Sequence, residues 1–145
     1  MGSLAINNKK NSVGYRFRNF DLSNLSSIVS TARKGIRTKV FYDFAQTIKI
    51  PEKNLASILN LSSRTISNHH AEEKVLKPIY SEHLLKLINL YEKGETIFGN
   101  IDEFNYWLRK PFRIKKIIPF DLLDTSGGVD LIINELDKLA QGYPI

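Results

Sequence analysis

The sequence predicts an all-α protein, in which a helix-turn-helix domain is followed by a second, smaller helical domain. Along most of the chain apolar residues recur three and four positions apart, which is the period of an amphipathic helix. Residues that cap helices precede these stretches, and glycine or proline follows them. Alternating apolar and polar stretches, which are typical of strands, are scarce, so we expect no sheet.

Residues 1–20 are predicted to form a flexible basic arm. Asn7 to Ser12 is polar, and Tyr15 to Phe20 alternates aromatic and basic side chains. The alternation is compatible with a short strand or with an extended segment lying on a partner, and arms of this kind can also enter a DNA groove. A frayed terminus with one docked aromatic side chain is the simpler interpretation.

Four helices are predicted between residues 21 and 80, which we take as the helix-turn-helix domain. Their expected start and end signals are glycine, proline and capping hydroxyl residues: Gly35, Thr38, Pro51 and Ser62. The fourth helix is expected to run from Ser62 to about His70. Lys74 to Tyr80 is predicted to be a connector, because Pro78 interrupts a helix.

Three further helices are predicted in the second domain, residues 81–145. Their expected caps and ends are Ser81 and Gly99 for a long helix, Asp102 and Pro111 for a short one, and Thr125 or Ser126 and Gly142 for the last. Residues 112–120 are compatible with an extended segment. Gly127 and Gly128 are interpreted as a loop hinge.

The basic charge is concentrated in the first half of the chain. Residues 1–72 carry 11 Lys and Arg against 4 Asp and Glu, and residues 73–145 carry 10 against 11, for a net charge of +6. Basic surfaces bind nucleic acid by displacing the counterions that condense on phosphate. A solvated basic surface with no such ligand explains the charge equally well.

The segment from Glu52 to His70 has the features of a DNA-binding helix-turn-helix. Two short helices at a steep angle need a small residue at their contact, an apolar residue in the turn and an apolar residue facing inward from the second helix. Ala56, Leu61 and Ile66 meet these three needs. An ordinary pair of bundle helices is the alternative, but the absence of any acid from Lys53 to His70 favours DNA binding.

The outward residues of the second helix and two flanking cations are the predicted DNA-binding residues: Ser62, Ser63, Arg64, Thr65, Ser67, Asn68, His69, Lys53 and Arg37. Arg64 is expected to read guanine and Asn68 to read adenine in the major groove. Arg37, Lys53 and the nearby Lys39 are expected to contact phosphate, which positions a protein without reading sequence.

Catalytic and metal-binding chemistry is not expected. The chain has no cysteine, and His69 and His70 point about 100° apart on a helix, so they chelate one metal poorly. His83 is remote from both, and Asp121 and Asp124 are interpreted as turn and capping residues. Without a phosphate-binding glycine loop, a signal peptide or a membrane span, we expect a cytoplasmic protein with no enzyme activity, cofactor or metal.

The C-terminal half carries an ordered set of motifs: Ile97-Phe98-Gly99, Phe104-Asn105-Tyr106-Trp107-Leu108 with Pro111, Pro119-Phe120-Asp121-Leu122-Leu123-Asp124-Thr125 with Gly127 and Gly128, and Leu136 to Gly142-Tyr143. This set resembles the toxin-binding domain of the Xre/MbcA/ParS-type antitoxins. Leu61 to Ile66 is similar to part of the Xre-like helix-turn-helix domain of the same family. The resemblance covers about residues 22–145. It departs at Lys115 to Ile118, where the family often has glycine, and at Asn68-His69, where it often has a second arginine.

Membership would imply an antitoxin of a type II toxin–antitoxin system. Such a protein represses its own operon at an operator in double-stranded DNA, and it binds a cognate toxin, most often a RES-domain toxin that consumes NAD⁺. It also forms a homodimer and has no catalytic activity of its own. In RES pairs the C-terminal part of the antitoxin blocks the cleft of the toxin, and the matching residues here are Gly142 and Tyr143.

Six residues are predicted to bind the toxin: Trp107, Phe120, Gly142, Tyr143, Pro144 and Ile145. Aromatic side chains serve equally as core and as interface anchors, and core is the preferred interpretation for Trp107 and Phe120. An apolar tail beyond the last helix has little core to join, which makes residues 142–145 the stronger partner contact. The alternative is a stand-alone Xre-like repressor without a toxin partner, whose second half only dimerises.

Overall fold

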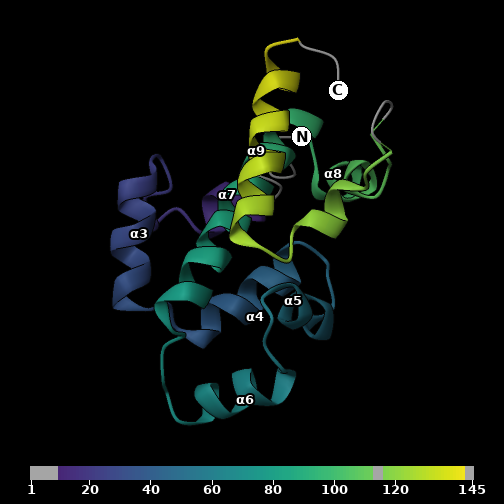
Figure 1. The fold of residues 1–145 in the computed structure, drawn as a ribbon. Helices are drawn as coiled ribbons and strands as arrows, with labels where there is room; N and C mark the ends of the chain where they lie inside the picture. The colour runs from purple at the N-terminus through teal and green to yellow at the C-terminus, as the bar shows by residue number, and fades with distance from the viewer. Residues whose placement is uncertain (1–9, 113–115, 143–145) are drawn as a thin grey trace.

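The computed structural model describes residues 10–112 and 116–142, and in those ranges the chain is built from helices (Figure 1). No strand occurs in this part, where an isolated antiparallel bridge joins Arg37 and Val75. The predicted all-α class is confirmed. The helices in chain order are α2 (Val13–Arg16), α3 (Leu25–Lys34), α4 (Thr38–Thr47), α5 (Glu52–Ile58), α6 (Ser63–Ala71), α7 (Pro78–Phe98), α8 (Ile101–Leu108), the 3-10 helix η1 (Pro119–Leu122) and α9 (Ser126–Ala140).

Three predicted helix signals are confirmed. Ser62 caps α6, because its Oγ accepts a hydrogen bond from the N–H of Thr65 at 3.0 Å. Thr125 caps α9 in the same way through the N–H of Gly128 at 2.9 Å. Gly99 ends α7 with a left-handed φ of 91°, a conformation that glycine adopts without steric cost.

Two other predicted caps lie inside their helices. Asn100 rather than Asp102 caps α8, by accepting from the N–H of Glu103 at 2.8 Å. Asp102 occupies the first turn, where the helix dipole favours a carboxylate. Thr38 is the first helical residue of α4, one position after the N-cap Arg37.

Ser81 is not the expected cap, because α7 begins at Pro78. Proline suits the first turn of a helix, where its missing N–H needs no partner, so it starts this helix instead of interrupting one. Ser81 is buried, and its Oγ accepts from the N–H of Ile36 and donates to the carbonyl of Leu76, both at 2.9 Å. The predicted connector is therefore shorter, and Ser81 satisfies two buried backbone groups.

Helix α7 is the centre of the molecule, with α2, α3, α8 and α9 packed against it (Figure 1). Its fully buried residues lie on more than one side, as expected for a helix enclosed by partners: Leu84, Leu85, Leu87, Ile88, Leu90 and Tyr91. Even so, neither α7 nor any other helix in the described ranges combines the length and apolar character needed to cross a membrane.

Residues 13–17 of the predicted arm belong to the packed body. Val13 is fully buried, and its N–H donates to Oε1 of Glu95 at 2.9 Å. Phe17 meets Phe44 edge-on, with ring centroids 5.8 Å apart, so Phe17 is the docked aromatic residue of the simpler interpretation. The expectation of a strand or extended segment is wrong, since one helical turn places Val13 and Phe17 on the same buried side. Residues 1–9 lie outside the described part of the chain.

The link between α8 and α9 turns more tightly than an extended segment. The N–H of Phe112 donates to the carbonyl of Ile117 at 2.8 Å, and η1 follows. Gly127 and Gly128 lie in the first turn of α9, so the hinge interpretation is wrong. A Cβ at Gly128 would overlap the carbonyl oxygen of Leu122, which explains why this position needs glycine.

Polar contacts join the first domain to the second. An amide of the helix-turn-helix donates to the residue before the α9 cap, an amide of α8 donates to the residue after α4, and an ion pair joins the segment after α4 to α8. The atom pairs are Asn60 Nδ2 to Asp124 O at 2.8 Å, Asn105 Nδ2 to Ile48 O at 2.9 Å, and Lys49 Nζ to Asp102 Oδ2 at 3.0 Å. The two domains therefore form one continuous body.

Candidate nucleic-acid interface and partner-binding surface

Helices α5 and α6 form a helix-turn-helix. Ala56 and Ile66 are each 1% exposed, and Leu61 is half-buried in the turn. The N–H of Leu61 donates to the carbonyl of Ala56 at 2.9 Å, which closes the turn. Asn60 has a left-handed φ of 61°, a conformation that asparagine adopts more readily than most residues. The three apolar residues expected to hold this motif together are packed as the motif requires.

Helix α6 lies at one end of the molecule, and its outer side points away from the other helices (Figure 1). Ile66 is its buried residue. Ser63, Arg64, Ser67 and Asn68 are exposed, and their side chains have no hydrogen bond or ion pair to any residue that the structure describes. These four side chains are therefore available to a ligand.

Three of the predicted DNA-binding residues are already engaged within the chain. Ser62 Oγ and Thr65 Oγ1 lie 2.8 Å apart, and His69 Nδ1 lies 2.9 Å from the carbonyl oxygen of Thr65. Sequence reasoning missed His70, whose Nδ1 lies 2.8 Å from Thr38 Oγ1 and links α6 to α4. No local signal pointed to this contact, because the two residues are 32 positions apart.

The cations predicted to contact phosphate differ in their surroundings. Arg37 and Lys53 are exposed and form no ion pair within the described chain, whereas Lys39 Nζ lies 2.7 Å from Asp43 Oδ2. A hollow of about 390 Å³ lies where the start of α4 meets the end of α6, and it is lined by Arg37, Thr38, Lys39, His70, Glu73 and Lys74. Two of its three cations are paired, Lys39 with Asp43 and Lys74 with Glu72, both at 2.7 Å, so Arg37 is the cation of this lining that has no ion pair within the described chain.

Trp107 and Phe120, the aromatic residues predicted to bind a partner, are each half-buried. Trp107 stacks on the fully buried Phe104, with ring centroids 6.0 Å apart. The guanidinium of Arg109 lies 4.2 Å from the ring centroid of Phe120. Each of the two rings therefore packs on the protein and keeps part of its surface accessible.

The predicted contact at residues 142–145 is described only at its start. Gly142 is exposed and has a φ of 89°, after α9 ends at Ala140. Tyr143, Pro144 and Ile145 lie outside the described residues. The C-terminal end of α9 is at the opposite end of the molecule from α6 (Figure 1).

His83 is buried in α7, where it holds η1 in place. Its Nε2 lies 2.8 Å from the carbonyl oxygen of Leu123, so the neutral ring donates this hydrogen bond. Burial lowers the pKa of His83, although the Leu123 carbonyl acts in the opposite direction. Asp121 and Asp124 are exposed around the same turn, and the described ranges contain no cluster of His, Asp or Glu suited to a metal ion.

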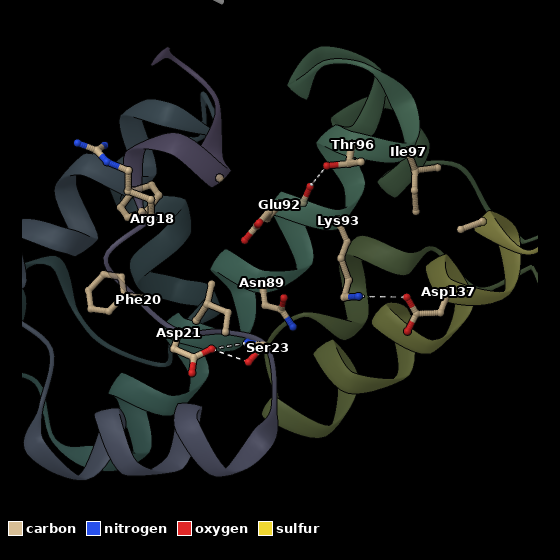
Figure 2. Close-up of a pocket in the computed structure, with 14 residues that line it drawn as sticks. Arg18, Phe20, Asp21, Ser23, Asn89, Glu92, Lys93, Thr96, Ile97 and Asp137 are labelled. Carbon is tan, nitrogen blue, oxygen red and sulfur yellow. Dashed lines mark hydrogen bonds and ion pairs between the residues drawn. The ribbon is translucent and has the colours of Figure 1, made fainter. Parts of the chain in front are cut away.

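A groove of about 650 Å³ lies between residues 17–23, α7 and α9 (Figure 2). Lys93 Nζ lies 3.3 Å from Asp137 Oδ1 across it. Asp21 accepts hydrogen bonds from the hydroxyl and the N–H of Ser23, which lower the pKa of Asp21. Sequence reasoning missed this groove because three distant segments form its walls. The groove is lined by both acidic and basic side chains, some of them paired with each other, and such a lining does not favour the binding of a polyanion such as DNA.

Two family models match successive parts of the chain. Residues 27–89 match the family model described as the antitoxin Xre-like helix-turn-helix domain. Residues 93–142 match the model of the antitoxin Xre/MbcA/ParS C-terminal toxin-binding domain. The matched segments meet within α7.

Two curated relatives cover most of the chain. A protein of Sphingobium sp. (strain YBL2) named Prs ADP-ribosylating antitoxin is 27% identical over 124 residues, which span 79% of this chain and 78% of the relative. A protein of Pseudomonas putida named Antitoxin Xre is 24% identical over 115 residues, which span 74% of this chain and 72% of the relative. With both domains matched in order, the chain belongs to the Xre/MbcA/ParS family of antitoxins of toxin–antitoxin systems.

Proposed function

We propose that this antitoxin binds operator DNA through α6, represses its own operon, and neutralises a toxin through its C-terminal domain, without catalysing a reaction itself. The observation that carries the DNA-binding part is the exposed, acid-free outer side of α6, which lies clear of the second domain (Figure 1). A recognition helix must present such a surface to enter the major groove.

Within this proposal the exposed residues divide into two roles. Arg64 reads guanine by donating to O6 and N7, and Asn68 reads adenine by donating its amide N–H to N7 while its carbonyl oxygen accepts from the N6 amino group. Arg37 and Lys53 hold phosphate. A homodimer would bring two copies of α6 to half-sites about one helical turn apart, about 34–36 Å.

The test of DNA binding uses duplex DNA from the promoter of the protein's own operon. Fluorescence anisotropy compares the wild type with Arg64→Ala, and Lys138→Ala serves as the control because Lys138 is exposed on α9. We expect Arg64→Ala to weaken binding and Lys138→Ala to leave it unchanged. Wild-type affinity that is no higher for the promoter than for unrelated DNA would refute sequence-specific repression.

For the toxin, we propose a RES-domain protein that consumes NAD⁺. The name of the Sphingobium relative refers to ADP-ribosylation, and ADP-ribosyl transfer takes its ADP-ribose from NAD⁺. The C-terminal domain would cover the cleft of this toxin with Gly142 and the apolar residues that follow it in the sequence, Tyr143, Pro144 and Ile145.

The test of neutralisation is co-expression with the protein encoded by the adjacent open reading frame. The wild-type chain should restore growth, and a chain that lacks residues 142–145 should fail to restore it while still binding promoter DNA. If the wild type neither rescues growth nor forms a stable complex, the neutralisation proposal fails. If the truncated chain retains both activities, the assignment of the tail is wrong.

A further inference from the structure

The second domain contains its own basic segment, although its overall charge is close to neutral. From Phe104 to Phe120 the sequence has five Lys and Arg and no Asp or Glu, whereas the rest of residues 73–145 has five Lys and Arg against 11 acids. Residues 104–120 therefore form an acid-free basic stretch within an otherwise acidic domain sequence. Among the described residues its positive charge is carried by Arg109, Lys110 and Lys116, all exposed.

Two of these cations are held over exposed or half-buried aromatic rings. The guanidinium of Arg109 lies 4.2 Å from the ring centroid of Phe120, and Lys110 Nζ lies 4.2 Å from that of Tyr106. Tyr106 is 61% exposed. We call these four residues the cation–aromatic surface. Cation–π contacts order the cations at the surface and leave their charge unneutralised.

The lack of counterions distinguishes this surface from the neighbouring helices. In the part of the chain that is described, no carboxylate lies within 4.0 Å of Arg109 or Lys110. On α7, by contrast, Lys86 Nζ lies 2.8 Å from Asp130, and Lys93 is paired with Asp137. The cations packed between helices are thus matched inside the molecule, and the cations of the cation–aromatic surface are left for an external anionic group.

Helix α8, which carries Tyr106, is fixed by a packed aromatic cluster. Its Trp107 stacks on Phe104 and contacts Phe98 and Phe112, with ring centroids 5.5 to 6.0 Å apart. A helix that is already fixed by packing loses less conformational entropy when its side chains enter a complex. Aromatic residues and arginine together are also the residue types that dominate binding energy at protein interfaces.

Position in the fold favours a protein over nucleic acid as the partner. Helix α8 lies away from α6 (Figure 1), so a straight duplex seated on α6 is not directed at it. We propose that the cation–aromatic surface docks an acidic patch of the toxin. This inference rests on the proposed toxin binding, and it adds Tyr106, Arg109 and Lys110 to the contact residues.

A charge reversal with a matched control tests the proposal. The variant Arg109→Glu/Lys110→Glu changes the Arg-Lys pair after α8, and Arg33→Glu/Lys34→Glu changes the equivalent exposed pair at the end of α3. The probe is the purified protein encoded by the adjacent open reading frame, titrated by calorimetry at low and high salt. We expect the first variant to weaken binding about 10- to 100-fold and to reduce its salt dependence, and the control to change affinity less than about twofold.

A conservative variant separates charge from ring contact. Arg109→Lys keeps the charge but loses the planar guanidinium over Phe120, so we expect a smaller loss than with the double reversal. Thermal unfolding of each variant checks that the fold is retained. We expect it to be retained because the changed side chains are exposed.

The outcomes separate the two proposals. If the wild type does not bind the probe, toxin binding itself fails and this inference fails with it. If the wild type binds and Arg109→Glu/Lys110→Glu binds equally well, the docking surface alone is refuted. If that variant loses promoter DNA and keeps the toxin, the surface serves nucleic acid and the inference is overturned.

Discussion

Replacement of Gly94 by alanine should destabilise the protein, although the same change stabilises most helices. Gly94 lies within α7 and is buried. A Cβ there would come within 3.0 Å of three ring atoms of Phe104. Phe104 is fully buried and contacts the rings of Tyr91, Phe98 and Trp107, so the ring has no space into which to move.

The magnitude follows from two opposing effects. Alanine is favoured over glycine in a helix by about 1 kcal/mol. Overpacking of a close-packed core costs about 1–3 kcal/mol. We take the upper part of this range because the new methyl group would clash with three atoms of the Phe104 ring, which is itself confined by its neighbours. We therefore expect Gly94→Ala to lower the free energy of unfolding by about 1–2 kcal/mol.

Urea denaturation followed by circular dichroism measures this change. The control is Gly127→Ala, in the first turn of α9, where a Cβ would meet no atom within 4 Å. The control should be neutral or stabilising by up to about 1 kcal/mol. A Gly94→Ala variant as stable as the wild type, or more stable, would show that the core around Phe104 is looser than the structure indicates and would refute the reasoning.

Three further predictions concern α6 and α7. Arg64→Ala should weaken operator binding by about 1–3 kcal/mol and relax one base position; an equal loss on every DNA sequence in anisotropy titrations would instead place Arg64 on phosphate. Ser62→Ala should lower the free energy of unfolding by about 0.5–2 kcal/mol through the lost cap, with the exposed Ser63→Ala as a near-neutral control; equal effects of the two would contradict the capping role. Burial lowers the pKa of His83, so the unfolded state binds the proton more readily: stability should be complete above the unfolded pKa of about 6.5 and decline as pH falls toward the folded pKa. His83→Gln should flatten that decline between pH 7.5 and 5.5 in denaturation experiments, and an unchanged decline would assign it to other groups.

Local chemistry made much of the fold readable from the sequence. The caps at Ser62 and Thr125 and the end of α7 at Gly99 are recognisable because a cap and its helix lie within three or four residues of each other. The helix-turn-helix is recognisable for the same reason, since Ala56, Leu61 and Ile66 are close in sequence and their spacing sets which sides meet.

The roles of other residues depend on contacts between positions far apart in the chain, and the sequence did not predict them. Val13 and Glu95 are 82 residues apart, and their hydrogen bond helps to hold α2 on the body. The sequence around Ser81 predicts a helix cap, but in the structure its hydroxyl group is hydrogen-bonded to the backbone of Ile36 and Leu76. Neither role leaves a local pattern, because the partners of a backbone or hydroxyl group are chosen by tertiary packing.

The sequence by itself determined the helical class, the family and the acid-free outer side of α6, since all three depend on residue types at short spacing. Only the tertiary structure decided which cations have partners. Lys86 and Asp130 are 44 residues apart and become an ion pair because α7 packs on α9, whereas Arg109 and Lys110 end on a surface where none of the described carboxylates reaches them. The residue type sets the charge of a side chain, but its neutralisation depends on the distance to an opposite charge, and only the packing of the fold sets that distance.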